Sequence, residues 1–315
     1  MAGYLVRRVA LAVLLVFVVS SASLALASLA PGDYVTSAYG VNASPEQVAA
    51  ARARYGLDRP FASQYAAWLA RSLRFDFGRS MIYDRPVSEL VPERAANTAV
   101  LAAAALVFAT ALGLPLGILT GSRRRGILPV LVRGASLLVL SAPPLVTSLF
   151  LIFVAARTGW FPIGGMRSAG AAGMGDLAWH LALPALALGL PLAAMFERVQ
   201  SQAMAEVIDQ PFVVAALARG VPRRRVVWRG ALKAALRPTA AVYGLVVGSL
   251  LSGSFAVEVI TSWPGLGRLM LDALQARDVY LVAGCAAAGS VFLAAGTLFS
   301  DAVLAAVDPR ARRLE

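Results

Sequence analysis

Long apolar stretches alternate with shorter, arginine-bearing segments along the whole chain. Six of these stretches are long enough to cross about 30 Å of hydrocarbon, which takes about 20 helical residues. They lie at residues 9–30, 97–120, 131–156, 180–200, 239–260 and 281–307. All six are rich in Leu, Ala and Val and lack the strict alternation of a barrel strand. The pattern therefore predicts an all-α polytopic membrane protein with six transmembrane helices.

Glycine and proline occur within several of the predicted spans. The positions are Gly113 with Pro115, Pro143 with Pro144, Pro184, and Gly189 with Pro191. These residues free backbone groups that neighbouring helices must satisfy, so one interpretation is a set of kinked helices around a moving pathway. The other is that glycine and proline are simply more frequent in membrane helices. The sequence leaves both open.

The composition supports the membrane assignment. Hydrophobic residues make up 59% of the 315 residues and charged residues 15%, and the mean hydropathy is +0.71. Soluble domains contain about 45–50% apolar and about 25% charged residues. Cys285 is the single cysteine, which excludes an internal disulfide and a multi-cysteine metal site. We interpret it as a small core residue.

The distribution of basic residues predicts the orientation in the membrane. Arginines precede the first span, cluster between the second and third, and follow the last, and eight basic residues lie between Arg198 and Arg237. The short loops on the opposite side, after the third and the fifth spans, hold only four arginines: Arg157, Arg167, Arg268 and Arg277. Because cytoplasmic loops carry the Lys/Arg excess, we predict that both termini and the Asp209–Pro238 loop are cytoplasmic. The net charge of +12 follows from this topology, and no nucleic-acid partner is needed to explain it.

The chain is expected to divide into four parts. Residues 1–30 form an N-terminal transmembrane helix, which is retained although Ala25-Leu26-Ala27 resembles a cleavage site, because its apolar run exceeds the roughly 7–15 residues of a signal peptide. Residues 31–94 form a small extracytoplasmic segment with helices beginning at Ser44 and about Ser63. Residues 95–307 form the main membrane domain, with a loop at about 205–238, and residues 308–315 a cytoplasmic tail.

Residue types needed for several kinds of chemistry are missing. A phosphate-binding P-loop ends in Gly-Lys, whereas the only lysine, Lys233, follows Leu232. The spans are nearly free of the mid-membrane carboxylates typical of ion-coupled carriers. His180 is the only histidine, and we interpret it as an interfacial or helix-start residue. We therefore predict no catalytic, cofactor or metal site and a pathway that is passive or driven by a partner.

The Asp209–Pro238 loop carries the most specific sequence signal. PFVVAALARG at 211–220 and RGALKAALRP at 229–238 resemble the two halves of the corresponding loop in the membrane subunits of bacterial ABC importers. More narrowly, the chain resembles the first permease of the dipeptide/oligopeptide/nickel group. Further matching segments follow in order along nearly the whole chain: LAPGD at 29–33, YGLDRP at 55–60, FGRS at 77–80, GLPLGI at 113–118, TGWFP at 158–162, HLALPALALG at 180–189, SWPGLGRL at 262–269, ARD at 276–278 and DPR at 308–310.

The resemblance implies the type I importer permease fold and a loop that forms a short coupling helix seated in a groove of a cytoplasmic ATPase. The implied coupling residues are Phe212, Val213, Ala215, Ala216, Ala218, Arg219 and Gly220. Phe212 replaces the family's usual tyrosine, Val214 its arginine and Gly230 its histidine, and these departures bear on the strength and pairing of the interface. The run from Arg223 to Arg225 is interpreted as positive-inside bias or contact with anionic lipid rather than with the ATPase.

The resemblance also implies partners and a location. They are a sibling permease, two ATPases that hold ATP and Mg, an extracytoplasmic solute-binding protein and the lipid of a bacterial inner membrane, with no cofactor bound by this chain itself. Uncharged polar residues that could line the pathway, or equally pack helices, are Asn97, Thr98, Ser141, Thr147, Ser148, Ser249 and Ser252. The favoured function is peptide import. Import of nickel or another small solute is the alternative, and a non-transport membrane scaffold or enzyme subunit is a remote one.

Overall fold

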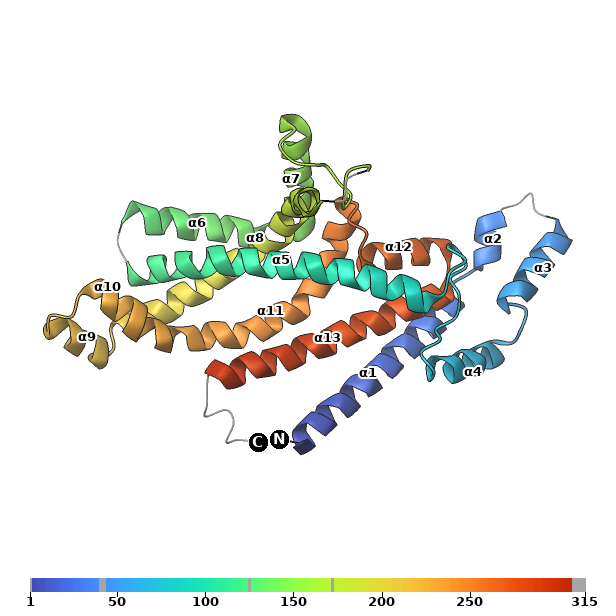
Figure 1. The fold of residues 1–315 in the computed structure, drawn as a ribbon, viewed down its shortest axis with the longest axis horizontal. Coiled ribbons are helices and arrows are strands. Elements are labelled where there is room, and N and C mark those ends of the chain that lie inside the picture. The colour runs from blue at the N-terminus through green and yellow to red at the C-terminus, as the bar shows by residue number, and fades with distance from the viewer. Residues whose placement is uncertain (1, 40–43, 124–125, 171–172, 308–315) are drawn as a thin grey trace. The chain divides into compact units, whose positions relative to one another are not determined.

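A computed structural model of the chain describes residues 2–39, 44–123, 126–170 and 173–307, and these residues are largely helical (Figure 1). Contacts divide the chain into two compact units. Unit 1 contains Met1–Thr98 and Pro264–Ala294, and unit 2 contains Ala99–Trp263 and Ala295–Glu315. Helices α5 (Val87–Ser122) and α13 (Val279–Val307) each contribute residues to both units. The predicted boundary at residue 95 therefore falls inside α5.

Four helices are long and apolar enough to cross a membrane on their own. They are α1 (Ala2–Leu29), α5, α8 (Met174–Ile208) and α13. Two further candidates are bent pairs, so the described residues supply four spans, or up to six if each bent pair is one span. The all-helical polytopic architecture is thus confirmed, whereas the count of six stays a prediction.

The apolar stretch predicted as a span at 131–156 is not one unbroken helix. The segment forms α6 (Ile127–Ser141) and α7 (Pro144–Thr158), which meet at 107° (Figure 1). Ala142 has an extended backbone (φ −90°, ψ 124°), as does Pro143 (ψ 144°), because a residue before proline is driven out of the α region. Pro144 then starts the next helix, a position that needs no amide proton.

The other prolines named above leave their helices unbroken. Helix α5 continues past Pro115, and α8 continues past Pro184 and Pro191. The second bent pair runs through α10 (Arg223–Arg225), the π-helical turn η1 (Val226–Ala231) and α11 (Leu232–Ile260), with 54° between Arg223–Gly248 and Gly253–Ile260.

Unit 1 contains the short helices α2 (Tyr34–Tyr39), α3 (Pro45–Tyr55), α4 (Phe61–Ser72) and α12 (Leu266–Ala276). The predicted start of α3 is confirmed, since the Ser44 hydroxyl accepts from the Gln47 amide and the Gln47 side chain accepts from the Ser44 amide, forming a capping box. Gly56 ends α3 in the left-handed conformation. Helix α12 was not expected from the sequence. Its buried Leu269 belongs to a core that also includes Trp68 of α4 and Leu281 of α13.

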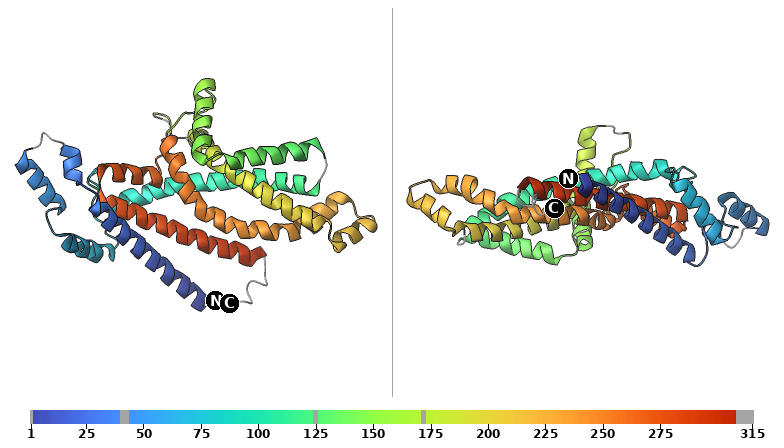
Figure 2. Two further views of the ribbon diagram at one scale, coloured as in Figure 1. Left: turned by 180° about the vertical axis from the view of Figure 1, so that it is seen from behind. Right: turned by 90° about the horizontal axis from the view of Figure 1, so that it is seen from below.

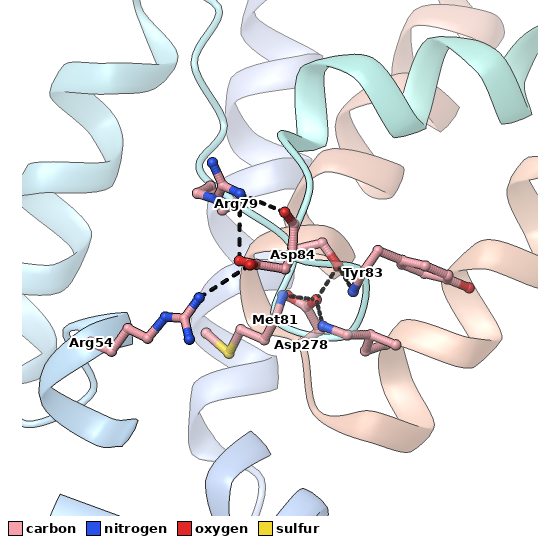
Figure 3. Close-up of polar contacts among 8 residues, drawn as sticks. Arg54, Arg79, Met81, Tyr83, Asp84 and Asp278 are labelled. Atoms are coloured by element: carbon pink, nitrogen blue, oxygen red, sulfur yellow. Dashed lines mark hydrogen bonds and ion pairs between the residues drawn. The ribbon is translucent and has the colours of Figure 1, made fainter. Parts of the chain in front are cut away.

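A buried carboxylate joins segments of unit 1 that are far apart in sequence (Figure 3). Asp278 accepts hydrogen bonds from the Ser80 hydroxyl at 2.7 Å and the Met81 amide at 2.6 Å. It also caps α13 by accepting from the Leu281 amide at 3.1 Å. Burial raises the pKa of the Asp278 carboxyl, and the hydrogen bonds donated to it oppose that shift. One side chain therefore fixes both the 78–83 turn and the start of α13.

The packing of α5 on α8 organises unit 2. A glycine occurs at every fourth position of α5, at Gly113, Gly117 and Gly121, and a Cβ atom at each would lie only 2.4–2.7 Å from a backbone oxygen of α8. The three oxygens belong to Ala193, Glu197 and Ser201. The two backbones touch along two turns, which is the close approach that small residues at i, i+4 spacing permit in membrane helices.

We expect Gly117→Ala to destabilise the protein, because its new methyl would lie 2.7 Å from both the Glu197 oxygen and the Gln200 Cβ. Overpacking of this kind costs about 1–3 kcal/mol. The measurement is the midpoint of thermal unfolding in detergent. Gly134→Ala in α6 is the matched control, because a Cβ there meets nothing within 4 Å. Equal midpoints for the two variants would contradict the close approach of α5 and α8.

Candidate functional site

A short helix, α9 (Pro211–Ala218), lies between the end of α8 and the beginning of α10, and it stands at one end of unit 2 (Figure 1, Figure 2). Its start is set by Pro211, which holds the preceding Gln210 in an extended conformation (ψ 147°) and occupies the first helical position itself. The chain therefore leaves α8, turns at Asp209-Gln210, and begins a separate helix. This is the helix that the resemblance led us to expect.

The end of α9 is a Schellman motif. The Gly220 amide donates to the Leu217 carbonyl at 2.9 Å and the Val221 amide to the Ala216 carbonyl at 3.2 Å, with Gly220 at φ +80°. These are the two bonds that define the motif, and glycine is the residue that adopts this φ without strain. Gly220 therefore ends α9, in the left-handed position that glycine commonly takes after a helix.

The two faces of α9 differ in exposure although nearly all of its residues are apolar. Val213 is fully buried, and Ala216 and Val221 pack against the same cluster. Phe212, Val214 and Leu217 are 46%, 54% and 41% exposed. Ala215 and Ala218 are also exposed, as are Arg219 and Gly220. We call Phe212, Val214, Ala215, Leu217 and Ala218 the outer face of α9. Val213, predicted as a docking residue, belongs to the inner face.

The inner face of α9 is part of a core that joins five helical segments. Its buried members include Val213 from α9, Met204 and Val207 from α8, and Ile118 from α5. Val226, Val227 and Ala231 of η1 and Ala235 of α11 complete it. A force on α9 is therefore transmitted to the ends of α5, α8 and α11, because close-packed side chains move together rather than compress.

The arginine run beyond α9, Arg223 to Arg225, makes a contact within the chain itself. Arg223 donates to the Ser122 carbonyl, the last residue of α5, at 2.8 Å. Its partner is thus a helix C-terminus, where a cation is favoured by the orphan carbonyls and the helix dipole. This contact fits the interpretation that the run is not primarily a docking element.

The polar residues proposed to line a pathway hydrogen-bond to backbone carbonyls and amides. Asn97 donates to the Pro264 carbonyl at 2.8 Å, and Thr98 accepts from the Leu266 amide at 2.8 Å. Asn97 thus connects α5 to the turn before α12, and Thr98 connects α5 to the first residue of α12. Ser141, Thr147 and Ser148 each donate to a carbonyl four residues earlier in the chain. The side chains of Ser249 and Ser252 lie outside the described part of the structure.

A set of buried polar side chains was missed by the sequence reasoning. Thr120 of α5 donates to Glu197 of α8 at 2.6 Å, and Thr239 of α11 donates to Gln200 of α8 at 2.7 Å. Glu197 and Gln200 are 2% and 0% exposed. The signal was present in the sequence as two polar residues one helical turn apart after an apolar run, but their partners come from helices far away along the chain.

These features define the class of protein as a multi-pass helical membrane protein with an exposed apolar helix between two of its longer helices. Comparison with known proteins makes the class narrower. Residues 113–313 match the family described as the inner membrane component of binding-protein-dependent transport systems. Residues 1–102 match the N-terminal part of such membrane components. The chain belongs to this family of ABC importer permeases, and it is therefore a multi-pass inner-membrane protein.

Curated relatives agree with this assignment over nearly the full length. The chain is 31% identical to the oligopeptide transport system permease protein AppB of Bacillus subtilis, with 98% of this chain and 99% of that protein covered. It is 35% identical to the oligopeptide transport system permease protein OppB of Mycobacterium tuberculosis, with 99% of each covered. The resemblance stated from the motifs is confirmed.

We expect Gly220→Ala to loosen the end of α9. A Cβ at this position meets nothing within 4 Å, so the cost is that of the left-handed backbone, about 1–2 kcal/mol for a residue with a side chain. Hydrogen–deuterium exchange at the backbone amides of positions 220 and 221 should therefore be faster in the variant than in the wild type. Gly230→Ala, also in open space, should leave exchange in this region unchanged. Unaltered exchange in Gly220→Ala would contradict the Schellman ending.

Proposed function

We propose that the chain is the permease subunit of an ATP-driven importer of di- and oligopeptides and forms half of the translocation pathway. The relatives it matches along nearly their whole length carry oligopeptide permease names, which supports the substrate class. The chain has no Gly-Lys P-loop ending, so ATP and Mg would be held by partner subunits. Those partners are a sibling permease, two ATPases and an extracytoplasmic solute-binding protein.

The observation that carries the coupling proposal is the outer face of α9. Phe212, Val214 and Leu217 form an exposed apolar surface on a helix that is fixed from behind by Val213 and closed by Gly220. A contiguous exposed apolar surface marks an interaction site. A short helix that presents an exposed apolar face fits the helix-in-groove mode of recognition. We infer that the ATPase groove receives this face.

The proposed orientation puts α9 and both termini in the cytoplasm and residues 31–94 outside. It is supported by the arginine count, since Arg219 and Arg223 to Arg225 adjoin α9 and cytoplasmic loops carry such residues. With this orientation, closure of the ATPases on ATP pulls on α9. The shared core of α9, η1, α8 and α5 carries the displacement to the spans, and the permease pair changes between inward- and outward-facing states.

We expect Phe212→Ala to weaken ATPase binding without unfolding the permease, because Phe212 is half exposed. Truncating an interface hot spot costs about 2 kcal/mol or more, which is roughly a 30-fold loss of affinity. The measurement is co-purification of the ATPases and peptide-dependent ATP hydrolysis by the complex in nanodiscs.

The matched control is Phe75→Ala, which removes an 81% exposed phenylalanine of unit 1. It should leave ATPase binding unchanged. A second variant, Val213→Ala, should differ from Phe212→Ala by lowering the thermal stability of the permease, because Val213 is buried in the chain's own core. Full ATPase retention by Phe212→Ala would refute docking through the outer face.

We expect the reconstituted importer to take up labelled short peptides in an ATP-dependent manner. The experiment compares peptides of two to five residues with Ni²⁺ in proteoliposomes that contain the permeases, the ATPases and the cognate binding protein. Peptide-independent uptake of nickel would favour the alternative substrate class. ATP hydrolysis with no uptake of either solute would contradict both import functions.

A further inference from the structure

A cavity of about 320 Å³ opens between α6 and α8 in unit 2. Three charged residues line it: Arg133 of α6, and Glu197 and Arg198 of α8. The two arginines outnumber the single glutamate, so the formal charge of these residues is +1. The cavity therefore matches a ligand with one negative charge.

The two arginines are positioned differently. Arg133 donates through Nη2 to the Thr120 carbonyl at 2.7 Å, which fixes the guanidinium at the cavity while its other N–H groups remain as donors. Arg198 is exposed, and within the described part of the chain it makes no hydrogen bond or ion pair. Two guanidinium groups at one cavity suit a phosphate, whose oxygens accept from each planar fork.

Glu197 adds an acceptor inside the cavity wall. Its Oε1 already accepts from the Thr120 hydroxyl at 2.6 Å, and the side chain is 2% exposed. A ligand that combines a phosphate with a hydroxyl or ammonium donor satisfies the arginines and the glutamate together. A bare inorganic phosphate satisfies only the arginines.

The remaining wall is apolar and follows one face of α6. Leu137 and Leu140 line the cavity and are 53% and 37% exposed. They follow Arg133 at i+4 and i+7, so the guanidinium and the leucines share a face of the helix. The cavity is therefore cationic at one end and continues along that face as an apolar surface.

The cationic end lies near the start of α6 and the end of α5. Arg133 is six residues after the start of α6 at Ile127, or about 9 Å at 1.5 Å per residue. Thr120 is two residues before the end of α5 at Ser122. In a membrane, this level corresponds to the boundary between headgroups and acyl chains, with the leucines deeper in the hydrocarbon.

We propose that this cavity binds the headgroup of an anionic phospholipid. Its phosphodiester, with one negative charge, accepts from Arg133 and Arg198, its hydroxyl groups donate to Glu197, and its acyl chains lie along Leu137 and Leu140. Basic pockets between transmembrane helices are known sites for lipid headgroups. The proposal requires only that the chain resides in a membrane, and it is independent of the substrate and of ATPase docking.

The test is native mass spectrometry of the purified permease with the partners that co-purify, titrated with phosphatidylglycerol or phosphatidylcholine of the same acyl chains. The wild-type protein should retain phosphatidylglycerol preferentially. Arg198→Gln should weaken that retention roughly tenfold, since one charge-assisted hydrogen bond is lost. Folding should be unaffected because Arg198 is exposed.

Arg229→Gln is the matched control, because it removes the same charge from an exposed arginine of η1 that does not line the cavity. It should retain the lipid as the wild type does. Equal loss in both variants would refute a specific site, and so would equal retention of the two lipids by the wild type. Displacement of phosphatidylglycerol by millimolar glycerol 3-phosphate would refute the acyl-chain contribution.

Discussion

The backbone contact between α5 and α8 is the constraint on which unit 2 depends. Gly113, Gly117 and Gly121 let α5 approach the carbonyl oxygens of α8 to a distance that any side chain would prevent. This approach brings Thr120 to Glu197 and Ile118 into the core beneath α9. In hydrocarbon, the burial of apolar side chains gives little driving force for helix association. Van der Waals packing and interhelical hydrogen bonds must therefore hold the helices together. The glycines make both possible.

The same contact links α9 to the longer helices of unit 2. Helix α9 is too short to be stable by itself, because isolated helices shorter than about 12–15 residues are marginal in water. It persists because Val213 is buried among residues of α5, α8 and η1 and because Gly220 closes its last turn. The arrangement leaves Phe212, Val214 and Leu217 exposed on a rigid support. A partner that moves this face moves the helices behind it.

Unit 1 is held by a different kind of interaction. The Asp278 carboxylate accepts hydrogen bonds from the Ser80 hydroxyl and from two loop amides, and it also caps α13. The side-chain bonds of Asn97 and Thr98 to the 264–266 turn serve a similar purpose. Asn97 and Thr98 were predicted either to line a pathway or to pack helices. Their hydrogen bonds give them structural roles, because a buried polar group that lacks a partner is costly.

The sequence by itself determined the protein class, the apolar segments, the cap of α3 at Ser44 and the end of α9 at Gly220, because these depend on composition and on local backbone preferences. It also identified the family through its ordered motifs.

Only the tertiary structure decided that Pro143-Pro144 breaks a helix while Pro115, Pro184 and Pro191 do not. It alone separated the inner face of α9 from the outer, since an almost wholly apolar helix has no periodicity to read. It also paired Thr120 with Glu197 and Ser80 with Asp278, because partners 77 and 198 residues apart are chosen by packing, which no local pattern encodes.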